Sequence, residues 1–137
     1  MNREIKFRAK RKDNNKWAFG DLVKDNAGGA WIETNLQTWR ENCDDVDAFG
    51  SRLYVDIDTV GQFTGRNDKN GKEIYDGDIL RHLNGNTFQV LYSNRTTSFI
   101  LISISHKEVG LDLGIYDTEN CFEVIGNIYD NKELLED

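Results

Sequence analysis

Residues 64–81 read TGRNDKNGKEIYDGDILR and place Asn70-Gly71 between two runs that carry apolar residues. Asn-Gly accepts the positive φ angles of a type I′ turn, so the stretch predicts a β-hairpin joining TVGQFTG (59–65) to EIYDGDIL (73–80). We expect the Asp68 side chain to cap the backbone of this loop.

The same stretch has Asp68, Asn70 and Gly71 at the spacing of an EF-hand calcium loop. Such a loop needs an oxygen ligand at position 1 and a bidentate Glu at position 12. With Gly71 at position 6, Arg66 takes position 1 and Gly77 takes position 12. A calcium site is therefore excluded, and the stretch is interpreted as a turn.

Alternation of apolar and polar residues recurs on both sides of this hairpin. In IKFRAKR (5–11) and around Trp17 and Phe19 it predicts an N-terminal β-hairpin that turns at residues 13–15. Residues 26–52 have no clean period. We expect a short helix or an ordered loop there, with three apolar side chains turned inward: Trp31, Leu36 and Trp39.

Strand patterns dominate the second half of the chain. LYVDIDTVGQFTG (53–65) reads as one strand, and a second Asn-Gly hairpin at Asn84-Gly85 follows. Several short strands from about residue 76 onward predict a small SH3-like antiparallel barrel, and residues 132–134 predict a short helical turn capped by Asp130 or Asn131. The expected fold is mainly β: an N-terminal β-hairpin and irregular segment, then the barrel.

Length and charge limit the class of protein. The 137 residues predict a single domain, 1–137, with subregions 1–58 and 59–137, and carry a net charge of −7. Residues 1–16 hold seven Lys or Arg against Glu4 and Asp13, a balance of +5 that leaves −12 for the remainder. Two distant cysteines and the absence of a long apolar run predict a cytoplasmic protein with no membrane segment.

Three separated blocks carry a family resemblance: EIKFRAK (4–10), TVGQFTGRNDKNGKEIYDGDIL (59–80) and VIGNIYDNKELL (124–135). With these blocks the chain resembles the YopX family of bacteriophage and prophage proteins, although Lys10 stands where such proteins usually carry Trp. The resemblance implies a β-rich, phage-borne protein in the cytoplasm of a bacterial host cell. It implies no reaction.

The sequence offers few candidate residues for catalysis or metal binding. Asp56 and Asp58 would lie about 7 Å apart on one strand face, a separation suited to a glycosidase pair or a divalent ion, or simply to a solvated face. The acidic run that contains Asp44, Asp45 and Asp47 reads as a hydrated loop. A zinc site would have to combine distant residues, namely His82, His106, Cys43 and Cys121. We therefore expect no enzyme activity, cofactor or metal.

The candidate contact residues are basic and alternate along the first strand: Lys6, Arg8, Lys10 and Lys12. Their repeat of about 7 Å matches the spacing of successive phosphates, yet the same residues would protect a strand edge or dock on the acidic remainder. The leading hypothesis is a non-enzymatic accessory protein that acts by protein–protein interaction, as a homo-oligomer or with an unknown host or phage protein. The alternative is a nucleic-acid-binding small-barrel protein that uses the basic hairpin. An enzyme would instead need a cleft converging on Asp56, Asp58 or His82.

Overall fold

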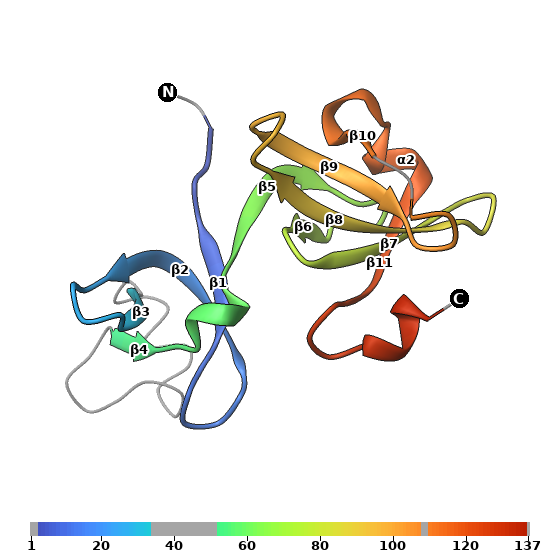
Figure 1. The fold of residues 1–137 in the computed structure, drawn as a ribbon. Coiled ribbons are helices and arrows are strands. Elements are labelled where there is room, and N and C mark those ends of the chain that lie inside the picture. The colour runs from blue at the N-terminus through green and yellow to red at the C-terminus, as the bar shows by residue number, and fades with distance from the viewer. Residues whose placement is uncertain (1–2, 34–51, 108–109, 137) are drawn as a thin grey trace. The chain divides into compact units, whose positions relative to one another are not determined.

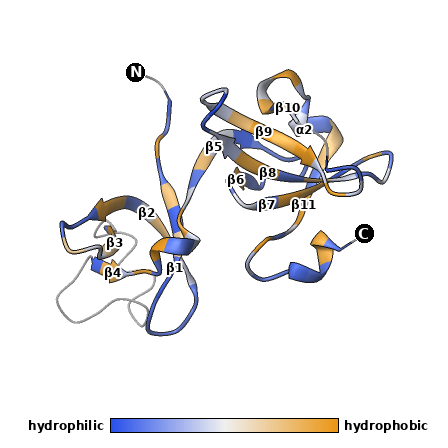
Figure 2. Cartoon of the chain, viewed as in Figure 1, coloured by the Kyte–Doolittle hydropathy of each residue, from blue (hydrophilic) through white to orange (hydrophobic). Residues whose placement is uncertain are grey.

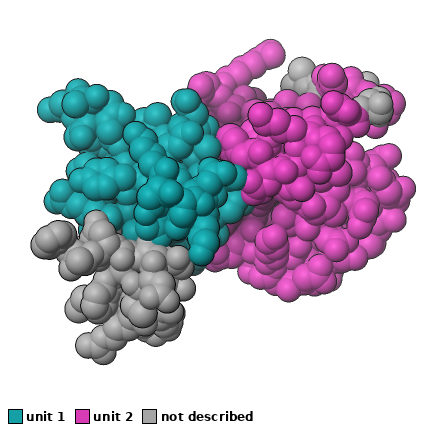
Figure 3. All heavy atoms as spheres, turned by 90° about the horizontal axis from the view of Figure 1, so that it is seen from below, with its two compact units in different colours: residues 1–62 teal, residues 63–137 magenta. Residues whose placement is uncertain are grey.

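A computed structural model describes residues 3–33, 52–107 and 110–136, and the fold is mainly β, as expected (Figure 1). The chain forms two compact units, Met1–Gln62 (unit 1) and Phe63–Asp137 (unit 2), which Figure 3 colours separately. The sequence suggested a division between residues 58 and 59. The boundary between the units falls within a strand, β5 (Gly61–Asn67).

Unit 1 is built from four antiparallel strands: β1 (Phe7–Lys10), β2 (Trp17–Lys24), β3 (Ala30–Glu33) and β4 (Arg52–Tyr54). The pairing of β1 with β2 confirms the predicted N-terminal hairpin. Just beyond β1, Arg11 bridges Val55, and the Lys12 amide donates to the Tyr54 carbonyl at 3.0 Å. The four strands therefore pair in a closed circuit, β1–β2–β3–β4 and back to the continuation of β1.

The core of unit 1 lies on one face of these strands. Its buried members are mostly small: Ala9, Ala18, Ala30, Ile32, Leu53 and Val55. Side chains alternate between the two faces of a strand, so the residues between these positions form an outer face. Small side chains suit this interior because four short strands enclose little space.

The expected continuous strand over residues 53–65 is wrong. A 3₁₀ turn, η1 (Ile57–Thr59), separates β4 from β5. Asp56 Oδ1 accepts a hydrogen bond from the Asp58 amide at 3.0 Å, and the Thr59 hydroxyl donates to the Asp56 carbonyl at 2.6 Å. Asp and Thr side chains give the backbone local partners in place of a ladder, and that competition ends the strand.

The central hairpin joins β5 to β6 (Glu73–Tyr75). The Asp68 carboxylate accepts from the Asn70 and Lys72 amides, both at 2.9 Å, which confirms the predicted cap. The turn differs from the two-residue form, because the Asp68 amide also bonds the Lys72 carbonyl and only Gly71, at φ 79°, has a positive φ. The connection is a three-residue loop with Gly in the left-handed position.

Unit 2 contains a five-stranded antiparallel sheet in the order β10-β9-β8-β7-β11. Its strands are β7 (Asp78–His82), β8 (Thr87–Ser93), β9 (Ser98–Ser103), β10 (Leu111–Asp112) and β11 (Phe122–Asn127). The β7–β8 connection confirms the second Asn-Gly hairpin. Among the described residues no ladder joins β10 to β11, so no closed barrel is seen there, and the small antiparallel β fold agrees with the predicted fold class.

Short helical segments complete unit 2: η2 (Leu113–Ile115), α2 (Thr118–Cys121) and η3 (Lys132–Leu135). The last of these is the predicted C-terminal helical turn. Asn131 occupies its N-cap position, but the Asn131 side chain accepts from the Asn127 amide instead of capping the turn. None of the described helices has the length and apolar character that crossing a bilayer requires.

A second hydrophobic core lies in unit 2, and Figure 2 shows hydrophobic residues along much of β9. Its buried members are Ile74, Leu80, Val90, Leu101, Leu113 and Phe122. Phe122 sits at the centre of edge-to-face ring contacts with His82, Phe88 and Tyr116, at centroid distances of 5.0–5.8 Å. Such contacts add about 0.5–1.5 kcal/mol each to the burial of the rings.

Several sequence-based predictions concern residues outside the described ranges: Leu36, Trp39, Cys43, Asp44, Asp45 and Asp47. Of residues 26–52, the described part contains strand β3, which carries Trp31 half-buried rather than on a helix.

Candidate functional site

The predicted basic strand face is not the exposed stripe that alternation suggested. Arg8 and Lys10 are only 6% and 9% exposed. The guanidinium of Arg8 lies 4.6 Å, and the ammonium of Lys10 5.5 Å, from the centre of the Trp17 ring. Trp17 faces Lys10 across the β1–β2 ladder, so the hairpin register brings both cations onto one indole.

The other two predicted contact residues have different surroundings. Lys6 forms an ion pair with Glu4 at 3.0 Å. Lys12 follows β1 in the hairpin loop and is exposed. The structure therefore brings Arg8 and Lys10 together and leaves Lys12 as the most accessible of the four cations.

A different set of side chains stands out on the outer face of unit 1. We name it the aromatic–arginine face, and it consists of Trp31, Glu33, Arg52 and Tyr54. Strand register assembles it, since Trp31 is paired with Tyr54 and Glu33 with Arg52 across β3 and β4. Tyr54 is 52% exposed.

The aromatic–arginine face is held together by contacts within itself. The Arg52 guanidinium lies 4.7 Å from the centre of the Trp31 ring, and the Tyr54 ring lies 5.9 Å from it. Glu33 Oε1 accepts from Trp31 Nε1 at 2.8 Å and lies 3.5 Å from Arg52 Nε. One carboxylate thus orients an indole and a guanidinium, which limits the rotamers that the exposed groups must lose on binding.

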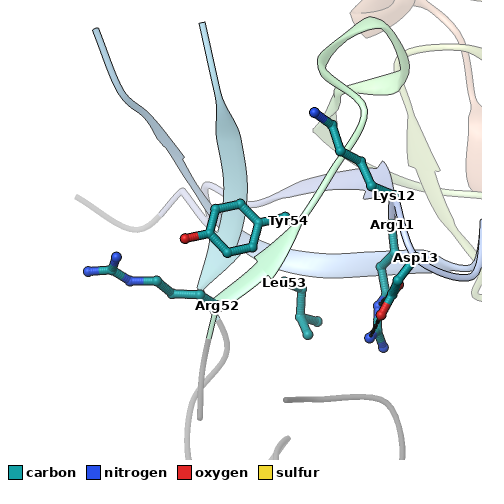
Figure 4. Close-up of a pocket in the computed structure, with 6 residues that line it drawn as sticks. All are labelled: Arg11, Lys12, Asp13, Arg52, Leu53 and Tyr54. Atoms are coloured by element: carbon teal, nitrogen blue, oxygen red, sulfur yellow. Dashed lines mark hydrogen bonds and ion pairs between the residues drawn. The ribbon is translucent and has the colours of Figure 1, made fainter. Parts of the chain in front are cut away.

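A hollow of about 130 Å³ adjoins this face. It is lined by Arg11, Lys12, Asp13, Arg52, Leu53 and Tyr54 (Figure 4). In Figure 4, Arg52 and Tyr54 extend to the same side of β4, whereas the Lys12 side chain points away from both. The volume is well below the roughly 300 Å³ at which small-molecule sites begin, so the hollow suits a single inserted side chain.

One wall of the hollow is an ion pair. Arg11 donates to both carboxylate oxygens of Asp13, at 2.9 and 2.6 Å. These hydrogen bonds from Arg11 hold the pKa of Asp13 below its usual value. The pair is bidentate and therefore fixes the hairpin loop beside Lys12.

A family model described as YopX protein matches residues 6–136, nearly the whole chain. The chain belongs to the YopX family. This chain is also similar in structure to the crystal structure of protein EF1440 from Enterococcus faecalis, with a TM-score of 0.56 and 20% identity, covering 98% of this chain and 100% of that one. At this identity the likeness shows the fold alone. No curated protein matches the chain.

The residues considered for catalysis take structural positions in this YopX chain. Asp56 and Asp58 do not project from a strand face, because they lie at the start of η1, where Asp56 caps the turn. His82 packs its ring against Phe122 and accepts at Nδ1 from the Asn84 amide at 3.1 Å, which supports the β7–β8 turn. Within the described ranges, no three metal-ligating side chains come together.

Sequence reasoning missed the aromatic–arginine face of the YopX chain. In the sequence, Arg52 and Tyr54 alternate with the apolar residues Leu53 and Val55, which are buried. This alternation was enough to indicate that Arg52 and Tyr54 lie on the same outer face. Their partner Trp31 lies before residues 34–51, however, and no local pattern indicates which earlier strand β4 joins. The residue types could therefore be read from the sequence, but the proximity of Trp31 to Arg52 and Tyr54 could not.

Proposed function

We propose that this protein is a phage or prophage accessory protein that acts in the bacterial cytoplasm by binding another protein, without catalysis or a cofactor. The proposed phage or prophage origin and bacterial host are supported by membership of the YopX family. The mode of action rests on the aromatic–arginine face, whose residue types and exposure are those of a binding surface.

The contact of Arg52 with Trp31, beside exposed Tyr54, carries this proposal. Trp, Tyr and Arg dominate the residues whose truncation weakens protein interfaces most. Here the three lie on adjacent strands and are oriented by Glu33, so little side-chain freedom remains to be lost on association. The adjoining hollow would accept one side chain of the partner.

The test is affinity capture from phage-infected or lysogenic cells with the immobilised full chain, followed by binding measurements with the purified partner. We expect Tyr54→Ala to weaken binding by roughly 30-fold, the effect of losing about 2 kcal/mol at a dominant interface residue. Tyr92→Ala is the matched control, because Tyr92 is a similarly exposed tyrosine, at 42%, in unit 2. Equal binding by the wild type and Tyr54→Ala would overturn the proposal.

Binding of nucleic acid through the basic hairpin is the alternative. Its support is the grouping of Arg8 and Lys10 of β1 on Trp17 of β2, which supplies two cations and a ring on one hairpin. Their burial counts against it, since a phosphate would have to displace them from the indole. The discriminating variant is Lys6→Glu/Lys12→Glu, which leaves the buried pair intact. Affinity for single-stranded DNA that falls steeply with salt and disappears in this variant would favour nucleic acid.

A further inference from the structure

Unit 2 contains two loops with the same backbone and the same Asn-Gly dipeptide, residues 68–72 and 82–86. In each loop the amide of the first residue donates to the carbonyl of the last at 2.8 Å. Gly71 and Gly85 have positive φ angles of 79° and 93°, and their amides donate to the carbonyl of the first loop residue at 3.0 and 2.8 Å. Both dipeptides are exposed. The two loops therefore differ in their side chains and not in their backbone.

An exposed Asn-Gly dipeptide can modify itself. The glycine nitrogen attacks Cγ of the asparagine side chain and forms a bond to it, the Cγ–Nδ2 bond breaks, and ammonia leaves with the proton of the glycine amide. A cyclic imide remains, and water opens it at either carbonyl to give an aspartate or an isoaspartate. Glycine favours the attack because it has no Cβ to keep the backbone away from the side chain. No cofactor or oxidant is needed.

The backbone of the first loop is held by a charged acceptor. The Asp68 carboxylate accepts from the Asn70 and Lys72 amides at 2.9 Å and, through Oδ2, from the Val124 amide at 2.9 Å. Asp68 is only 3% exposed. Hydrogen bonds to an ionised group are roughly twice as strong as those between neutral groups. The asparagine backbone must rotate before the glycine nitrogen can reach Cγ, so these bonds oppose the reaction at Asn70.

The backbone of the second loop is held by neutral acceptors. His82 Nδ1 accepts from the Asn84 amide at 3.1 Å, so this nitrogen carries no proton. The Asn86 amide donates to Asn84 Oδ1 at 2.9 Å. Among the described residues the Asn70 carboxamide forms no such bond, which favours Asn70 by one neutral hydrogen bond. The bonds of the charged acceptor in the first loop outweigh this difference, and local opening is easier at Asn84.

We propose that Asn84 is a site of spontaneous modification through attack by Gly85, and that the Asp68 carboxylate protects Asn70 from the same reaction. The product at position 84 carries an additional negative charge. An isoaspartate also lengthens the main chain between β7 and β8, and loop length sets the register of a hairpin. The reaction therefore alters the β7–β8 hairpin with time, independently of the aromatic–arginine face.

The test is to incubate the folded full chain at neutral and mildly alkaline pH and to follow the conversion of each asparagine by mass spectrometry of its peptides. We expect Asn84 to convert at least about fivefold faster than Asn70, since one loop is held by neutral bonds and the other by charged ones. Asn94 is the internal control. It is exposed but is followed by Arg95, whose side chain hinders the attack, so it should stay unchanged.

Two comparisons separate the effect of the fold from that of the sequence. In concentrated urea, where neither loop is formed, Asn70 and Asn84 should convert at similar rates. In Asp68→Asn the acceptor becomes neutral, so Asn70 should convert faster while the rate at Asn84 is unchanged; circular dichroism checks that this variant is folded. Conversion of Asn70 as fast as that of Asn84 in the folded wild type would overturn the proposal. So would no conversion at Asn84, or a difference between the two sites that persists in urea.

Discussion

Asp68 shows how one side chain can connect distant parts of the chain. It is 3% exposed, and its Oδ1 accepts from two amides of its own turn. Its Oδ2 accepts from the Val124 amide of β11 at 2.9 Å, and the neighbouring Lys69 amide donates to the Phe122 carbonyl at 2.9 Å. The sequence predicted the cap. It did not predict the bond to β11, which joins residues 56 positions apart.

We expect Asp68→Ala to lower the free energy of unfolding by about 3 kcal/mol, because three backbone donors lose a charged acceptor in a buried place. Asp25→Ala is the control. Asp25 Oδ1 accepts from the Ala27 and Gly29 amides in the same two- and four-residue pattern, but on the surface, so about 1 kcal/mol should be lost there. Urea denaturation measures both. Equal losses would show that the bond to Val124 contributes nothing.

At the scale of elements, close approach of two strands explains a glycine within β2. Gly20 has a φ of 152°, and a Cβ built there would lie 2.3 Å from the Glu33 carbonyl oxygen of β3. Gly71 in the central hairpin also has a positive φ, but nothing lies within 4 Å of its position. The two glycines therefore serve different purposes, strand packing at Gly20 and turn conformation at Gly71.

Gly71→Ala should lower the free energy of unfolding by about 1 kcal/mol, the ordinary cost of a left-handed alanine. Gly20→Ala should lower it by more than about 2 kcal/mol, because the β2–β3 backbones must separate as well. Gly114→Ala, at an open position without positive φ, is the neutral reference. Thermal and urea denaturation of the three variants provide the comparison. A smaller loss for Gly20→Ala than for Gly71→Ala would refute the account of β2–β3 packing.

At the scale of the whole molecule, the chain has two hydrophobic cores, one in each unit. Fully buried Ile32 belongs to the first, and Leu101, 1% exposed, belongs to the second. Truncating either to alanine should cost about 2–5 kcal/mol. Since contiguous cooperative units open separately, we expect Ile32→Ala to accelerate amide exchange mainly in unit 1 and Leu101→Ala mainly in unit 2.

Hydrogen–deuterium exchange read by mass spectrometry, peptide by peptide, tests this division. The strand β5 is the informative region because it begins in unit 1 and ends in unit 2. Acceleration spread evenly over both units in either variant would mean that the chain unfolds as one cooperative body.

Local sequence patterns were sufficient to predict much of the fold. Alternation and Asn-Gly dipeptides act within a few residues, so the mainly β class, the hairpins at residues 10–17, 67–73 and 82–87, and the C-terminal helical turn could be read from the sequence alone. The three sequence blocks were also sufficient to indicate the family. The error over residues 53–65 arose where alternation and side-chain capping conflict, and Asp56 and Thr59 decided the outcome.

Only the tertiary structure decided which side chains share a surface. The burial of Arg8 and Lys10 on Trp17 follows from the β1–β2 register, and the contact of Arg52 with Trp31 follows from a β3–β4 pairing that spans residues 34–51. The return of β4 to Arg11, which closes unit 1, is equally non-local. Pairings between distant segments depend on the packing of the whole core rather than on any local period. The sequence by itself therefore determined the kind of structure this protein forms, and the folded chain determined the surface with which we propose it binds.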